Sequence, residues 1–194
     1  LTRLFVATWI LIFDSTNDLA RGIAKDWSRI ITHAFLEDGY NHNAYKEAYY
    51  DIHKSSKEKY LWGFENFYVV SILNGMLSSP IESKFLDYIM ESQNGIYYIY
   101  DRCSKIPPSS FYSKIASRYI NVHELLSNYT GAKPKLQYFV EWVNDNISED
   151  GFWDMGQLVK DNIQFPLSNS WRDHVNRKID CTVRIQKILS RLDK

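Results

Sequence analysis

Three glycines, Gly39, Gly95 and Gly151, recur at a constant spacing of 56 residues. Each follows a stretch with helix-like periodicity that ends in an acidic or amide residue, and each precedes an aromatic or apolar residue. Self-similarity at a fixed period of this length is typical of folds in which one supersecondary unit is repeated and stacked. The spacing therefore constrains the architecture far more tightly than it constrains the chemistry.

Apolar residues at helical spacing occupy most of the chain around these glycines. We expect helices over residues 1–13, 18–36, 41–53, 65–77, 111–129 and 173–192, with further helices that begin at Pro80 and near Pro134. One stretch, Ile96–Tyr100, has the composition of a strand. Because no second strand-like run lies nearby, we expect an extended connection there and no sheet.

Each predicted unit contains a helix, a glycine turn and a second helix that returns antiparallel to the first. Three such units span residues 18–77, 80–129 and 133–192, and the helix over residues 1–13 resembles the second half of an earlier unit. Glycine suits the helix ends because it adopts the left-handed conformation without a Cβ penalty. The sequence thus predicts one all-α domain over residues 1–194, built from about three and a half antiparallel helix hairpins.

Composition excludes several classes of protein. The chain is 45% hydrophobic and 24% charged, as in ordinary soluble proteins, and its net charge of zero provides no general attraction to nucleic acid. The apolar run at residues 1–13 is too short to cross a bilayer, so we predict a buried helix and no membrane span. The two cysteines are too few and too far apart for a disulfide framework, which favours a reducing, cytoplasmic location.

Two segments carry a family resemblance. Residues Trp142–Trp153, which contain Asn-Ile-Ser-Glu-Asp-Gly-Phe-Trp, and Tyr88–Tyr97, which contain Ser-Gln-Asn-Gly-Ile-Tyr, resemble repeats of the prenyltransferase and squalene-cyclase α/α-toroid superfamily. The resemblance covers the two C-terminal units well and the first weakly. It implies a ring of about six hairpins around a central cavity, so this chain would be the C-terminal part of a longer toroid, an open arc, or a ring completed by a second copy or another chain.

The catalytic motifs of that superfamily are not found in this sequence. There is no Asp-x-Asp-Asp acid motif and no Asp-Asp-x-x-Asp magnesium motif, and the alternative magnesium motif suggested by Asn144–Ser148 has Phe152 at its glutamate position. The zinc motif Asp-x-Cys is not matched either, because Asp180 and Cys181 are adjacent. We therefore predict no metal and no cofactor, and we interpret Cys181 as a core thiol.

Polar and aromatic residues beside the glycine turns are the best candidates for a functional site. Aromatic rings beside carboxylates and an arginine suit a sugar, a cationic ligand or an aromatic peptide. The candidates are Tyr97, Tyr98, Asp101, Trp153, Asp154, Trp171, Arg172 and Asp173. Two of them also have a structural interpretation, in which Asp173 caps the last helix and Trp171 packs against it. We interpret the histidines as structural or surface residues.

The sequence leaves three functions open. The first is a terpenoid-cyclase-like or prenyltransferase-like toroid protein of unassigned activity. The second is a helical-repeat interaction module that binds a partner protein, a second copy or the rest of its own toroid. The third is a carbohydrate-active α/α barrel that binds a glycan and uses Asp101 and Asp154 as acid and base.

Overall fold

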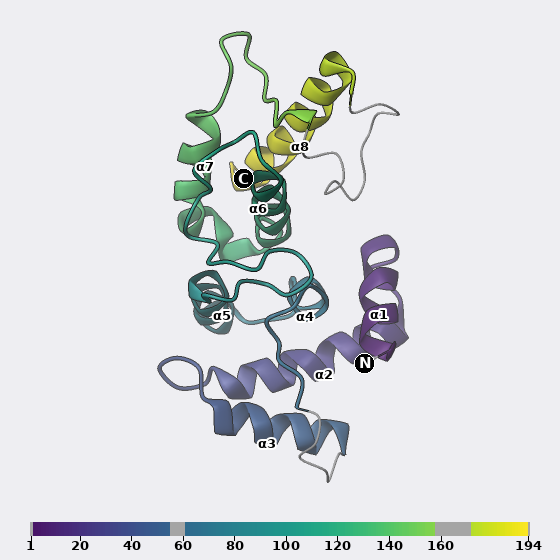
Figure 1. Ribbon diagram of the computed structural model, residues 1–194. Coiled ribbons are helices and arrows are strands. Elements are labelled where there is room, and N and C mark those ends of the chain that lie inside the picture. The colour runs from purple at the N-terminus through teal and green to yellow at the C-terminus, as the bar shows by residue number, and fades with distance from the viewer. Residues whose placement is uncertain (1, 55–60, 158–171, 194) are drawn as a thin grey trace.

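The computed structural model describes residues 2–54, 61–157 and 172–193, and in these ranges the chain is all-helical (Figure 1). Its helices are α1 (Thr2–Phe13), α2 (Asp18–Ala34), α3 (His42–His53), α4 (Phe67–Ile72), α5 (Ser79–Glu91), α6 (Lys114–Leu126), the 3-10 helix η2 (Thr130–Lys135), α7 (Gln137–Asn144) and α8 (His174–Leu192). The described β structure consists of isolated bridges around the Gly95 turn. The all-α class is therefore confirmed. Residues Ile96–Tyr100 form no sheet with the other described residues, but they make a tight turn and not the predicted extended connection, because the N–H groups of Ile99 and Tyr100 both donate to the Ile96 carbonyl at 3.0 Å.

Pairwise contacts connect most of the described helices. Helix α2 packs against α3 and α5, α5 packs against η2, and η2 packs against α7, while α1 contacts both α2 and α4, and α6 contacts α8. In Figure 1 the α2–α3 pair lies at one end of the stack and the α7–α8 region at the other. The buried apolar side chains of these elements form one core cluster. None of the described helices has both the length and the apolar character that a membrane crossing requires.

All three period-defining glycines have positive φ, with values of 103° at Gly39, 65° at Gly95 and 79° at Gly151. The last two turns share a hydrogen bond, in which the glycine N–H donates to the carbonyl of Ser92 or Ser148 at 3.1 and 2.9 Å. In the first turn the Gly39 N–H donates instead to the Glu37 carbonyl, at 2.9 Å. The turn geometry thus repeats most closely in the two C-terminal units.

Gly95 is the most constrained of the three glycines. The Ile96 N–H donates to the Tyr100 carbonyl at 2.8 Å, which folds the following segment back over the glycine. A Cβ at Gly95 would lie 2.2 Å from the Tyr100 carbonyl oxygen and 2.5 Å from that of Arg102. No atom lies within 4 Å of a Cβ placed at Gly39 or Gly151, so those turns require only the left-handed conformation.

Two helices are shorter in the structure than the apolar periodicity of the sequence predicted. Helix α4 begins only after Asn66, whose side chain accepts hydrogen bonds from the backbone N–H groups of Tyr68 and Val69. Helix α6 begins after Ser113, which accepts from the Ala116 N–H. A capping residue inside an apolar run sets the helix start, because its side chain satisfies N–H groups that have no intrahelical partner.

The prediction that the first helix is buried on every side is wrong. Leu4, Ala7 and Thr8 of α1 face the core, where the Thr8 hydroxyl donates to the Leu4 carbonyl at 2.9 Å. The opposite face is apolar and exposed, and it consists of Val6, Trp9, Ile12 and Phe13. An all-round apolar helix needs neighbours on all sides, and the described residues provide them on one side.

Three alanine substitutions test the glycine geometry. Gly95→Ala should lower the free energy of unfolding by at least about 3 kcal/mol, because the new methyl group meets backbone atoms that cannot move independently. Gly151→Ala should cost about 1–2 kcal/mol for the left-handed conformation alone. Gly22→Ala, inside α2 with open space around it, should stabilise by about 0.5–1 kcal/mol. Urea denaturation measures all three, and an equal cost at Gly95 and Gly151 would contradict the close packing.

Candidate functional site

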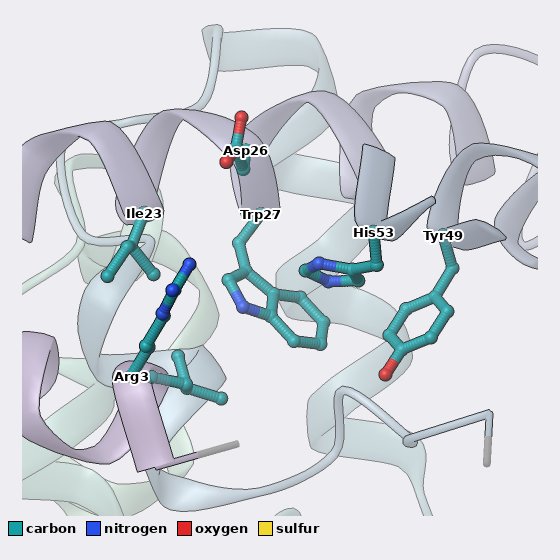
Figure 2. Close-up of a pocket in the computed structure, with 7 residues that line it drawn as sticks. Arg3, Ile23, Asp26, Trp27, Tyr49 and His53 are labelled. Carbon is teal, nitrogen blue, oxygen red and sulfur yellow. The ribbon is translucent and has the colours of Figure 1, made fainter. Parts of the chain in front are cut away.

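A cavity of about 300 Å³ lies where α1, α2 and α3 meet (Figure 2). Helix α1 contributes its first turn, α2 contributes its middle, and α3 contributes its C-terminal half. The lining residues are Arg3, Leu4, Ile23, Asp26, Trp27, Tyr49 and His53. None of the residues predicted as a site from the sequence is among them.

Helical spacing places these side chains on shared faces. Ile23 and Trp27 are four residues apart on α2, and Tyr49 and His53 are four residues apart on α3, so each pair projects from one side of its helix. Both helices begin at an asparagine cap, since Asn17 accepts from the Ala20 N–H and Asn41 from the N–H groups of Asn43 and Ala44. The packing of α2 on α3 then brings the two pairs together.

Three aromatic rings form one wall of the cavity. The Trp27 and Tyr49 rings lie 5.9 Å apart at 65°, the Trp27 and His53 rings 5.8 Å apart at 61°, and the Tyr49 and His53 rings 4.6 Å apart at 69°. All three pairs are edge-to-face, the arrangement that ring quadrupoles favour. Trp27 is 3% exposed and Tyr49 is 9% exposed, so the core holds two of the three rings in place.

The cavity contains one carboxylate and one guanidinium. Asp26 and Arg3 form no hydrogen bond and no ion pair with another of the described residues. His53 is exposed as a whole, but partial desolvation of its ring lowers its pKa below the ordinary value, while the Asp26 carboxylate opposes this shift. The imidazole is therefore neutral at pH 7, and the charges of Asp26 and Arg3 sum to zero.

Two of the predicted site residues, Tyr97 and Tyr98, form an exposed pair after the Gly95 turn. Their rings lie 4.1 Å apart, and the Tyr98 ring meets that of Tyr68 edge-on at 5.5 Å. Tyr98 has a φ of 75°, which is unusual for a bulky residue. Asp101 pairs with Arg118 at 3.1 Å, and the Asp101 side chain is well exposed whereas that of Arg118 is half-buried.

The other predicted residues lie against α7 and α8. The Trp153 indole is buried and donates to the Val143 carbonyl at 2.7 Å. Both oxygens of Asp154 accept from Arg177, at 2.6 and 2.8 Å. Asp173 caps α8, which confirms the structural interpretation of this residue, and Arg172 is exposed. Trp171 lies outside the described residues.

The predicted candidates therefore fall into two separate groups. Within the described parts of the chain, no hydrogen bond, ion pair or ring contact joins Tyr97, Tyr98 or Asp101 to Trp153, Asp154, Arg172 or Asp173. The cavity was missed because Trp27 and Tyr49 have the helical spacing of core residues. The signal in the sequence was the adjacency of Asp26 to Trp27 on an otherwise apolar stripe.

Two buried titratable residues have structural roles. His123 is fully buried, donates from Nδ1 to the Tyr119 carbonyl at 2.7 Å and accepts at Nε2 from the Tyr138 hydroxyl at 3.1 Å. Cys181 is a free core thiol, as expected, and burial raises its pKa to about 12. In the residues that the structure describes, no three His, Cys, Asp or Glu side chains form a group able to hold a metal ion.

Comparisons of the chain with family models, with curated proteins and with solved structures give no match.

His123 makes stability depend on pH. Burial lowers its pKa to about 3, so below about pH 6.5 the unfolded chain binds a proton that the folded chain does not. The free energy of unfolding should therefore fall as the pH drops, by about 2–3 kcal/mol between about pH 6.5 and 4.5. Urea denaturation of His123→Gln should show a lower stability at pH 7 and a flatter dependence on pH.

The matched control is His33→Gln, since His33 is exposed on α2. Its pH dependence should match that of the wild type. A wild-type slope that persists in His123→Gln would show that another group is responsible.

Proposed function

We propose that this protein is a helical-repeat binding module that takes a small organic cation in the cavity between α1, α2 and α3. The observation that carries the proposal is the wall of three edge-to-face rings, Trp27, Tyr49 and His53, with the Asp26 carboxylate at the same cavity. Ring faces attract cations through their quadrupoles, most strongly for tryptophan and where water is excluded. A carboxylate without a hydrogen-bond or ion-pair partner among the described residues adds a charge that such a ligand can balance.

The size and lining of the cavity favour a compact ligand with a methylated ammonium group. A volume of about 300 Å³ is at the lower end of the range for ligand pockets. A primary ammonium has three N–H groups to satisfy, and Asp26 is the one carboxylate among the lining residues. A quaternary ammonium needs no acceptor, and its methyl groups suit the apolar side chains of Leu4 and Ile23.

For the architecture that carries this cavity, we propose an open arc of the α/α-toroid type found in prenyltransferases and squalene cyclases. The support is the 56-residue period, the positive φ of all three glycines, and the shared Ser-to-Gly hydrogen bond of the last two turns.

The carbohydrate-hydrolase alternative has little support from the two candidate acids. Although burial raises the pKa of Asp154, the hydrogen bonds from Arg177 outweigh it and hold the pKa below its ordinary value. A general acid needs the opposite shift. Asp101 is held by Arg118 in an exposed ion pair.

A second candidate function is self-association, which rests on the exposed apolar faces of two helices. Helix α1 exposes Val6, Trp9, Ile12 and Phe13, and α8 exposes Val175, Ile179 and Val183 at four-residue intervals. The two apolar stripes lie on different helices near different ends of the chain. One copy can therefore bury its α1 stripe against the α8 stripe of a second copy. The contact would be heterologous, with α1 of one copy against α8 of the next.

Calorimetric titration with choline tests the cation site. Choline should bind at least about tenfold more tightly than its uncharged isostere 3,3-dimethylbutan-1-ol, because only choline gains the attraction of the rings and Asp26. Asp26→Asn should weaken choline binding by about tenfold. Asp51→Asn, an exposed acid on α3 outside the cavity, is the matched control and should leave affinity unchanged. Equal affinities for choline and 3,3-dimethylbutan-1-ol would contradict the proposal.

Sedimentation velocity tests the self-association. The wild type should form dimers or larger species with rising concentration, and Phe13→Glu or Ile179→Glu should each give monomers, because a charge on either stripe opposes its burial. Mixing the two variants should restore a heterodimer, since each supplies the stripe that the other lacks. Leu36→Glu, at another exposed apolar residue, should associate like the wild type. A monomeric wild type would contradict this function.

A further inference from the structure

The cation site has a second charged wall, formed by Arg3. In Figure 2 the Arg3 side chain lies on one side of the Trp27 ring, and His53 and Tyr49 lie on the other side. The Arg3 guanidinium forms no ion pair with a described carboxylate. A ligand that carried only positive charge would leave this guanidinium unbalanced inside the cavity.

We propose that the ligand is a small zwitterion, with an N-methylated ammonium group at the Trp27, Tyr49 and His53 rings and a carboxylate at Arg3. This inference rests on the proposed cation site and specifies its ligand. With Asp26 negative, Arg3 positive and His53 neutral at pH 7, the described residues that line the cavity carry no net charge. A ligand that is itself neutral overall, but divided into two charged ends, matches that distribution.

Arginine suits the anionic end for a geometric reason. Its planar guanidinium donates two parallel N–H groups to a carboxylate, which fixes the direction of the ligand as well as its charge. Arg3 comes from the first turn of α1, whereas the rings and Asp26 come from α2 and α3. The two ends of the ligand would therefore contact different helices, and binding would join α1 to the α2–α3 pair.

The His53 ring makes this binding sensitive to acid. Among the described residues, the charged and titratable groups that line the cavity with it are Asp26 from α2, Arg3 from α1 and Tyr49 on its own helix. Protonation of the imidazole would place a positive charge beside the ammonium end and next to Arg3. Affinity should thus be constant above neutral pH and fall as the pH drops below the ordinary range of histidine titration.

Titration with three related probes tests the zwitterion directly. Glycine betaine has both charges, choline has only the cation, and 3,3-dimethylbutanoate has only the anion on a similar apolar frame. In the wild type at pH 7.5, betaine should bind about tenfold more tightly than either of the others. Arg3→Gln should lose this preference for betaine over choline. Choline would no longer be repelled by the positive guanidinium, and the betaine carboxylate would no longer have a guanidinium to pair with.

Arg21→Gln is the matched control, since Arg21 is exposed on α2 outside the cavity. It should retain the wild-type preference, and circular dichroism should show both variants folded. Betaine binding should also weaken several-fold at pH 5, and His53→Gln should remove most of that pH dependence.

The outcomes separate the two proposals. If choline binds as well as betaine, and better than its uncharged isostere, the zwitterion is wrong and the cation site stands. If 3,3-dimethylbutanoate binds as well as betaine, the cavity is an anion site and both proposals are wrong. If none of the probes binds, the cation site fails and the zwitterion fails with it.

Discussion

The rest of the fold depends on the turn at Gly95. At this point the chain leaves α5, reverses, and passes its own carbonyl oxygens so closely that no Cβ fits. The reversal places Tyr97 in a bridge with Asn66, and Asn66 in turn caps α4, so one turn sets the start of the helix that supports α1. A larger residue would disturb the turn and, through Asn66, the packing of α1 on α4. Since α1 supplies one wall of the cavity, we expect a larger residue at position 95 to disturb the cavity as well.

The cavity itself is a consequence of helix packing. Asparagine caps fix where α2 and α3 begin, and a four-residue spacing on each helix then aligns Trp27 with His53 and Tyr49. Burial holds two of the rings, while the carboxylate and the guanidinium remain without protein partners among the described residues. Folding normally pairs or solvates such charges. Their placement at the edge of an aromatic cavity supports the ligand-binding role that we propose for them.

The sequence predicted the helical class, most helix positions and the left-handed glycines, because these follow from local periodicity and from the one residue type that tolerates positive φ. It did not predict which apolar helix face stays exposed, as α1 shows, because exposure depends on which neighbours the fold supplies. Nor did it predict the cavity, since Trp27 and Tyr49 have the spacing of core residues and meet His53 only in three dimensions. The residues favoured from the sequence were real local features, such as the Asp173 cap, but they do not form one site.

The most direct test of the central claim is to locate the bound methyl groups by NMR. In a complex with glycine betaine, the N-methyl protons should show nuclear Overhauser effects to ring protons of Trp27, Tyr49 and His53, since these rings form the aromatic wall. Effects to the exposed rings of Tyr97 and Tyr98 instead, or to no aromatic ring at all, would contradict the account.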